Sequence, residues 1–376
     1  MLQEKLLKMS DFIKKLEIKN FKSIKNLQLD CKRVNILIGK PNVGKSNILE
    51  ALSLLGGTYS LNEKKYFSEF IRYDNLSELF YDKKHRNPIE VNTDKVCAFL
   101  RFHNNSIGSY DYMVGGEWIN EFLNTEGNYS IADINKMFNQ FVSEHRNEKD
   151  FDKYILPAYI RFSEKMNEVI LETAHSFSVV KKYDFKSESK YASPFSAYLA
   201  PPNGRNLFTI LYQNDKLQEE INTALDEYGL QFVYKDETKE FEILKSVNRN
   251  ITLFPYSSMA DTFQRLFFYL AAIESNENAT LLFEEPEAHS YPPYIWQLAN
   301  RIAHDSHNQY FISTHSPFII ETLLQELKND EINVWVTGFE NYETKIHVLQ
   351  ANDLQDMYDM GADAVFFNMA KFEKVI

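Results

Sequence analysis

A segment near the N-terminus of this chain has glycine, lysine and serine at the spacing of a phosphate-binding loop. The pattern G-x-x-x-x-G-K-[ST] is met in full by Gly39-Lys40-Pro41-Asn42-Val43-Gly44-Lys45-Ser46, and Asn47 follows directly. Glycines let the backbone turn its N–H groups inward, so that Lys45 reaches the β- and γ-phosphates and the Ser46 hydroxyl binds Mg²⁺. A strand-like run, VNILIG, precedes the loop, and a helical pattern, ILEALSLL, follows it. The loop is therefore predicted to bind ATP with Mg²⁺.

Two adjacent carboxylates end a short apolar run in the C-terminal part of the chain. Leu281-Leu282-Phe283 indicates a buried strand that delivers Glu284 and Glu285 at its carboxyl end, where ligands of a parallel sheet bind. We predict that Glu284 holds Mg²⁺, directly or through water, and that Glu285 polarises the attacking water as general base. An ordinary surface turn is the alternative, which the upstream phosphate loop disfavours.

A histidine closes the next predicted strand, in Thr314-His315-Ser316. If this strand neighbours the acidic one, His315 lies beside Glu285 at the same sheet edge. A neutral imidazole there can hydrogen-bond the γ-phosphate or the attacking water, so Glu285 and His315 are the predicted catalytic residues. A lone histidine is more often structural, but this position favours chemistry. His289 lacks such support and is interpreted as a loop residue.

A serine pair precedes the helix that leads to the acidic strand. Ser257-Ser258-Met259-Ala260-Asp261 opens a segment with apolar residues at helical spacing, and Ser258 and Asp261 are spaced as a capping box. Taken alone, this pattern predicts only a well-capped helix.

The remaining patterns indicate how the chain is organised around these motifs. Alternation over 12–30 predicts a strand pair with one buried face. Further expectations are a strand over 96–103, mostly helix over 137–175, a glycine-ended helix over 216–229, a hairpin over 230–245 and a terminal hairpin over 333–350. We predict an α/β fold in which a P-loop head, with a mixed β-sheet flanked by helices, is interrupted by a mainly helical insertion. The head halves are expected over 1–105 and 251–376, and the insertion over 106–250.

The composition narrows the class of protein further. Of 376 residues, 44% are hydrophobic and 14% aromatic, which supplies a large core and argues against disorder. No apolar run is long enough for a membrane span, and the charged N-terminus does not resemble a secretory signal. Cys31 and Cys97 alone form no disulfide framework or cysteine cluster for zinc, so we expect a reduced, cytoplasmic protein without a membrane partner.

The net charge of −12 argues against a surface devoted to nucleic acid. The charge is uneven, because residues 1–40 hold ten Lys and Arg against four Asp and Glu. This basic strip can contact phosphates of nucleic acid, although solvated strand faces are the simpler interpretation.

With these motifs in this order, the chain resembles the ABC-type ATPases with split heads, the group that includes SMC and RecF-like proteins. It is most similar to the ATPase part of the overcoming-lysogenisation-defect (OLD) family and related bacterial anti-phage defence ATPases. The phrases that carry the resemblance are LEIKNFKSIKNL, ILIGKPNVGKSNILEAL, LLFEEPEAHSYP and FISTHSPFII, over roughly residues 12–55 and 251–325. The middle of the chain matches only in layout.

The resemblance implies a homodimer or higher homo-oligomer, joined through the ATPase heads. ATP on one subunit's loop is capped by the signature helix of the other, and by position Ser257 or Ser258 is the signature serine that contacts it. The segment SSMAD lacks the glycine usual there, which bears on the catalytic rate more than on binding. The Mg²⁺-sensing glutamine has no clear counterpart, since Gln213 and Gln231 lie in the predicted insertion.

Many OLD-type proteins continue into a Toprim nuclease domain, for which the residues after Ser316 leave no room. The resemblance therefore implies that any nuclease or toxin activity belongs to a separate effector protein, which this ATPase controls as a nucleotide-gated switch. Two other functions stay open: a RecF-like repair ATPase, which salt-sensitive binding of duplex DNA would favour, and an ATP-binding scaffold with little turnover.

Overall fold

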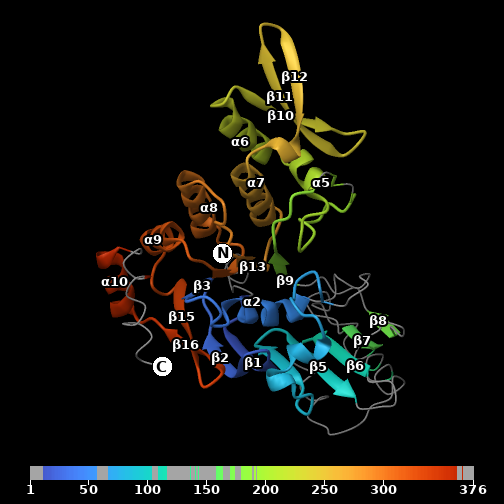
Figure 1. Ribbon diagram of the computed structural model, residues 1–376, viewed down its shortest axis with the longest axis vertical. Coiled ribbons are helices and arrows are strands. Elements are labelled where there is room, and N and C mark those ends of the chain that lie inside the picture. The colour runs from blue at the N-terminus through green and yellow to red at the C-terminus, as the bar shows by residue number, and fades with distance from the viewer. Residues whose placement is uncertain are drawn as a thin grey trace.

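Strand β3 (Val34–Gly39), which leads into the predicted phosphate loop, lies inside a six-stranded sheet of the computed structural model (Figure 1). The strand order is β16-β15-β3-β14-β13-β9. The other members are β9 (Val180–Tyr183), β13 (Thr280–Glu284), β14 (Gln309–Ser313), β15 (Ile332–Glu340) and β16 (Glu343–Val348). Neighbours pair in parallel, except that β16 runs antiparallel to β15. Strands β3, β14 and β13 are therefore adjacent and end at the same edge.

The structure describes residues 12–56, 67–103, 109–116, 158–163, 170–173 and 179–361 except 189 and 192, together with the single positions 136, 140, 143 and 366. Within these ranges, no helix has the length and apolar character needed to cross a membrane.

A second sheet is antiparallel and has seven strands in the order β2-β1-β4-β5-β6-β7-β8. Its strands are β1 (Lys15–Phe21), β2 (Ile24–Asp30), β4 (Ile89–Thr93), β5 (Cys97–His103), β6 (Ser109–Gly115), β7 (Ala158–Ser163) and β8 (Ile170–Thr173). Along β4 the residues alternate between buried and half-buried, which is the period-two pattern of a sheet with one covered face.

Successive residues of the six-stranded sheet point to opposite faces and enter two different hydrophobic clusters. On β13, Leu281 and Phe283 join one cluster, whereas Leu282 joins the other. The same alternation holds on β14, where Phe311 lies in the cluster of Leu282 and its neighbours Tyr310 and Ile312 do not. Both faces are covered, which explains why these strands read as continuous apolar runs.

Helix α2 (Lys45–Ser53) covers the face that also meets the seven-stranded sheet, with short 3₁₀ turns at Leu76–Leu79 and Tyr81–Lys83 nearby in the chain. The opposite face is covered by α7 (Asp261–Glu274), α8 (Pro292–His304) and α9 (Pro317–Glu326), and α10 (Ala351–Met360) packs beside α9 (Figure 1). The phosphate loop thus sits between a central strand and a helix buried in the core.

A small unit projects from the helical side of the head (Figure 1). It contains α5 (Leu207–Tyr212), α6 (Asp215–Asp226) and an antiparallel sheet of β10 (Leu230–Lys235), β11 (Glu240–Val247) and β12 (Asn250–Pro255). Arg301 of α8 ties this unit to the head, because it pairs with Glu220 of α6 at 2.7 Å and also with Glu274 of α7.

The predicted fold class is confirmed in its P-loop head with a mixed sheet flanked by helices, as are the strand pair over 12–30, the hairpin over 230–245 and the terminal hairpin. The helical expectation over 137–175 needs correction, since β7 and β8 lie there and the rest of that range falls mostly outside the described residues. Pairing of β7 with β6, a contact remote in sequence, overrides the local helical pattern. In the described part of 106–250, strands accompany helices α5 and α6, and β9 belongs to the six-stranded sheet.

A cavity mutation tests the two-faced packing of this sheet. Leu282→Ala removes a fully buried side chain from β13 and is expected to lower the free energy of unfolding by about 2–5 kcal/mol. The matched control, Leu253→Ala, truncates a 46% exposed side chain on β12 and should change it by less than about 0.5 kcal/mol. Urea denaturation followed by circular dichroism measures both, and equal effects would contradict the packing described above.

Candidate nucleotide-binding site

The two pattern glycines of the phosphate loop are required by the terminal hairpin packed beneath them. Gly44 has φ +104°, and a Cβ atom there would lie 2.0 Å from Thr344 Oγ1 of β16. Gly39 has φ +150°, and its Cβ would lie 2.4 Å from the carbonyl oxygen of Thr337 on β15. Both positions therefore exclude a side chain, because φ is positive and the space is filled. Strands β15 and β16, about 300 residues further along the chain, pack directly against the loop and support its conformation.

Lys45 begins α2 and points back into the loop. Its Nζ donates to the carbonyl oxygens of Gly39 at 2.9 Å and Lys40 at 2.8 Å. Burial lowers the pKa of Lys45, while the charges of Glu285 and Glu284 act in the opposite direction. The partly buried Lys45 ammonium therefore lies where it can donate hydrogen bonds to a phosphate group bound by the loop.

Glu284 lies at the end of β13 among three groups that stabilise its negative charge. Burial disfavours its ionised form, but Lys182, a hydrogen bond from Ser46 and Arg72 outweigh this and lower its pKa to about 2. Lys182 Nζ lies 3.1 Å and Arg72 Nη2 2.7 Å from the carboxylate. The carboxylate is therefore ionised at neutral pH, in the same cavity as the loop serine.

A buried carboxylate, Glu50 of α2, organises the cations beside this site. It is fully buried and pairs with Lys22 and, at 2.9 Å, with Arg72 Nε. Arg72 thus bridges Glu50 to Glu284, and Lys182 joins Glu284 to the carbonyl oxygen of Phe70 at 3.1 Å. Sequence reasoning missed Arg72, Lys182 and Glu50, because each is a single polar residue outside any motif. A lysine inside the apolar run VVKKY was the one signal available for Lys182.

Glu285 and His315 face each other across the neighbouring strands, as expected. His315 Nε2 lies 3.7 Å from Glu285 Oε1. Glu285 has φ +44°, and its backbone N–H donates to Ser313 of β14 at 2.9 Å, which fixes the turn after β13. Burial lowers the pKa of His315, Lys45 lowers it further, and Glu285 opposes them. The imidazole is thus neutral at pH 7 and can accept or donate a hydrogen bond.

Glu287 holds the histidine loop in place and was also missed. Its Oε1 accepts hydrogen bonds from Thr314 Oγ1 at 2.7 Å and from the backbone N–H of His315 at 2.8 Å. Burial raises the pKa of Glu287, although these hydrogen bonds oppose the rise. The last glutamate of Glu-Glu-Pro-Glu, Glu287, is therefore a positioning residue for His315. His289, interpreted as a loop residue, is indeed exposed in the loop between β13 and α8.

These side chains line one cavity of about 820 Å³. Of the predicted site residues it contains Pro41, Asn42, Gly44, Lys45, Ser46, Asn47, Glu284, Glu285 and His315. Gly39 and Val43 lie on the side of the loop that faces away from the cavity, where they pack against the protein and do not line the cavity. Arg265 of α7 also reaches this cavity. Among its described lining residues there is no glutamine, and neither Gln213 nor Gln231 takes part.

The serine pair lies outside this cavity. Ser257 and Ser258 form an exposed 3₁₀ turn with Tyr256, after β12. The expected capping box is not formed, because α7 starts after Ala260 and Ser258 Oγ donates to the carbonyl oxygen of Pro255 at 2.7 Å instead. Asp261 pairs with Arg265 at 2.6 Å, one turn along the helix.

The oxygen atoms that the site offers suit Mg²⁺ both in type and in number. Ser46 and Glu284, which line the same cavity, offer a hydroxyl and a carboxylate oxygen, and Mg²⁺ in nucleotide sites takes few protein ligands. No group of three or more His, Cys, Asp or Glu side chains suited to a metal occurs within the described ranges. A site with two protein oxygens is therefore consistent with a metal that phosphate oxygens complete.

Comparison with known proteins places this site in a family. A profile described as "AAA domain, putative AbiEii toxin, Type IV TA system" matches residues 127–321, just over half of the chain. The chain belongs to this AAA domain family. A second profile, described as a protein of unknown function, matches residues 11–91, which include the phosphate loop.

The curated relatives of this AAA domain chain include one that matches along nearly its full length. An "ATP/GTP phosphatase" from Helicobacter pylori is 21% identical over 91% of this chain and 93% of its own. The chromosome partition protein Smc from Methanocaldococcus jannaschii is 36% identical over 27% of this chain and 9% of its own. The DNA replication and repair protein RecF from Caldanaerobacter subterraneus is 31% identical over 28% of this chain and 30% of its own.

Solved structures similar to this AAA domain chain include heads of SMC proteins. An SMC head bound to the C-terminal winged-helix domain of ScpA gives a TM-score of 0.44 at 13% identity, with 92% of this chain and 99% of the other covered. The SMC head domain from Thermotoga maritima gives 0.39 at 12% identity, over 90% and 99%. The fold assignment rests on the strand order and loop described above.

The lowered pKa of Glu284 predicts a pH dependence of stability. Its ionised form is favoured in the folded state, so the stabilisation is complete above the unfolded pKa of 4.5 and is lost as pH falls toward about 2. The whole effect is on the order of 3 kcal/mol. Glu284→Gln should therefore destabilise the protein most at pH 6–7 and progressively less toward pH 3, as measured by urea denaturation. A destabilisation that stays constant over this range would contradict the assignment.

Proposed function

We propose that this chain is a Mg²⁺-dependent ATPase that works in the cytoplasm as a nucleotide-gated dimeric switch. One observation carries the proposal: Lys45, Ser46, Glu284, Glu285 and His315, taken from three adjacent strand ends, line a single cavity. A full-length relative named as an ATP/GTP phosphatase supports hydrolysis.

In the proposed reaction the loop and Lys45 bind the β- and γ-phosphates of ATP. Ser46 and Glu284 would hold Mg²⁺, which offsets phosphate charge and orients the phosphate oxygens when bound. Glu285 accepts the proton of a water whose oxygen bonds to the γ-phosphorus, while the bond to the bridging oxygen breaks to give ADP and phosphate. Neutral His315, positioned by Glu287, hydrogen-bonds the water or the γ-phosphate. Arg72 and Lys182 add positive charge at the cavity wall.

The proposed general base can be tested by an isosteric change. Glu285→Gln should lower the rate of ATP hydrolysis about 10²- to 10⁴-fold, because the amide cannot accept the proton. ATP affinity should stay near that of the wild type, which a fluorescent ATP analogue measures. The control is Glu277→Gln, an exposed acid outside the cavity, which removes the same charge and should leave turnover unchanged. Unchanged turnover in Glu285→Gln would show that another group is the base.

The proposed switch needs a second subunit to complete the site. Ser257 and Ser258 are exposed and lie outside the cavity of their own chain, so in the proposed dimer they face the nucleotide of the partner. The start of α7, which follows them, would offer backbone N–H groups to the γ-phosphate. Burial of two nucleotides between heads would make dimer stability depend on ATP.

Mixing two inactive variants tests this shared site. Lys45→Ala should fail to bind ATP, and the double variant Ser257→Ala with Ser258→Ala should bind ATP but hydrolyse it slowly. In an equimolar mixture with free exchange, half of the dimers combine one intact loop with one intact serine pair. The mixture should therefore recover about a quarter of wild-type turnover by random pairing of subunits. If the mixture stays as inactive as its components, the serines do not act across a dimer.

The resemblance to OLD-type defence ATPases supports a finer role. We propose that ATP-driven opening and closing of the heads, 1–105 with 251–376, is passed through the segment 106–250 to a separately encoded effector or nuclease in anti-phage defence. A DNA-repair role with bound duplex DNA is the second candidate, favoured by the local similarity to Smc and RecF. The acidic balance of the chain weighs against it.

A further inference from the structure

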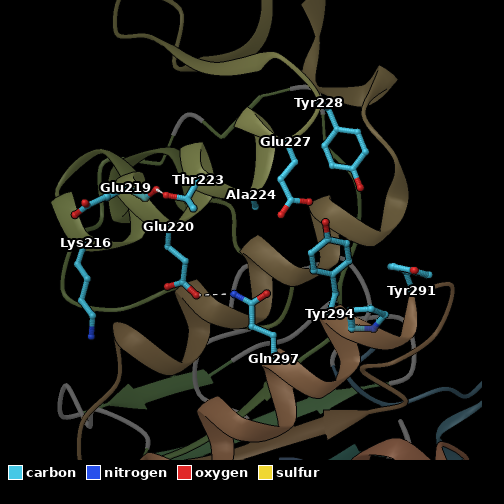
Figure 2. A pocket seen from close by; sticks show the side chains of 11 residues that line it. Lys216, Glu219, Glu220, Thr223, Ala224, Glu227, Tyr228, Tyr291, Tyr294 and Gln297 are labelled. Carbon is cyan, nitrogen blue, oxygen red and sulfur yellow. Dashed lines mark hydrogen bonds between the residues drawn. The ribbon is translucent and has the colours of Figure 1, made fainter.

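A second cavity, of about 730 Å³, lies between α6 of the projecting unit and the start of α8 in the head (Figure 2). One wall is α6 with Glu227 and Tyr228 just after it, and the other is Tyr291, Tyr294 and Gln297. It shares no lining residue with the P-loop cavity. The proposed ATPase chemistry leaves this cavity without a role.

Aromatic rings dominate one end of this cavity. Tyr291 and Tyr294 lie with their ring centroids 6.0 Å apart, and Phe263 of α7 packs against Tyr294 at 5.0 Å and Tyr228 at 5.6 Å. Figure 2 shows the hydroxyl groups of Tyr228 and Tyr294 turned toward each other. Tyr228 is 57% and Tyr291 59% exposed, so ring surface is open to a ligand.

Carboxylates give this aromatic cavity a negative charge. Glu220 is neutralised by Arg301 and also accepts from Gln297 at 2.8 Å. Within the described residues, the carboxylates of Glu219 and Glu227 have no ion-pair partner, and the only cation of the lining is Lys216. Figure 2 shows the Glu227 carboxylate beside the Tyr294 hydroxyl and Lys216 at the far end. The aromatic end is therefore complementary to a cation.

We propose that this cavity, lined by Tyr228, Tyr291, Tyr294 and Glu227, is a docking site for an arginine side chain on a segment of a partner protein. A guanidinium can stack on a tyrosine face, where the ring quadrupole attracts it, while its N–H groups donate to the Glu227 carboxylate. Burial of the rings under the incoming segment strengthens both interactions by excluding water.

The shape of the site favours a protein segment over a small free cation. Pockets for small ligands enclose most of the ligand surface, whereas here two of the three tyrosines remain more than half exposed. Trp296, 57% exposed, lies on the same helix one turn from Pro293, another residue of the lining. Exposed tyrosine and tryptophan beside a pocket are the residues on which protein interfaces concentrate binding energy.

The site contacts the start of α7 through a hydrogen bond and ring packing. The backbone N–H of Tyr291 donates to Thr262 Oγ1 at 2.9 Å, and Phe263 packs between Tyr228 and Tyr294. Thr262 and Phe263 lie in the first turn of α7, which follows the exposed serines. A docked segment would thus join the projecting unit to the helix that the proposed switch uses, although docking itself requires no ATPase activity.

Binding of a labelled hexa-arginine peptide to the full chain, without nucleotide, tests the docking site by fluorescence anisotropy. Tyr228→Ala and Glu227→Gln should each raise the dissociation constant about three- to fivefold, the range for loss of a solvent-exposed cation–π contact or ion pair, respectively. The double variant should raise it about tenfold or more. Glu237→Gln, which removes the same charge from the exposed β10–β11 turn, should leave it unchanged. A hexa-citrulline peptide, which has the same shape without the charge, should not bind.

Three results would overturn the proposal. Wild-type affinity in the double variant would exclude the cavity, and a thermal unfolding midpoint equal to that of the wild type shows that any loss of affinity is not a loss of fold. An equal loss in Glu237→Gln would show unspecific attraction to the acidic chain. Spermidine binding that depends on Tyr228 and Glu227 in the absence of any peptide binding would assign the cavity to a small cation. Because none of these measurements uses ATP, an inactive ATPase would leave the outcome unaffected.

Discussion

Parallel pairing of β14 with β3 on one side and with β13 on the other aligns three strand ends that are far apart in sequence. Glu284 pairs with Ser313, and Ser313 pairs with Leu37, two residues before the loop begins. A shift of one residue in either register would turn the apolar residues of a strand toward the wrong cluster, so the core itself fixes the alignment. The positions of Lys45, Glu285 and His315 depend on this register rather than on contacts among themselves.

The electrostatics of the cavity depend on segments that no motif marks. Arg72 comes from the region after α2 and Lys182 from β9, yet both contact Glu284. A buried carboxylate is stable only when it is paired, and Glu50 meets this requirement by sharing Arg72 with Glu284. The result is a continuous line of alternating charges from α2 to β13. Its members stabilise one another, so the loop region and β9 are coupled across the cavity.

Sequence patterns predicted the parts of this structure that are local and repetitive. VNILIG and LLFEE gave buried strands because both faces of the sheet are covered, and the glycine pattern placed the loop between strand and helix. Strands β7 and β8 were not predicted, because the local pattern favoured helix and β7 pairs with β6, a strand remote in sequence. Glu287 and Lys182 were missed for a similar reason, since each acts through partners remote in sequence.

Strand β3 pairs on both sides with strands from the last third of the chain, β14 and β15. During synthesis from the N-terminus, this apolar strand and the loop after it emerge long before either partner exists. The glycine loop also needs Thr344 beneath it to hold its shape. The nucleotide pocket can therefore form only after β14, β15 and Thr344 have been synthesised. Until then the apolar surface of β3 is unpaired and prone to aggregation, which is the kind of surface that chaperones bind.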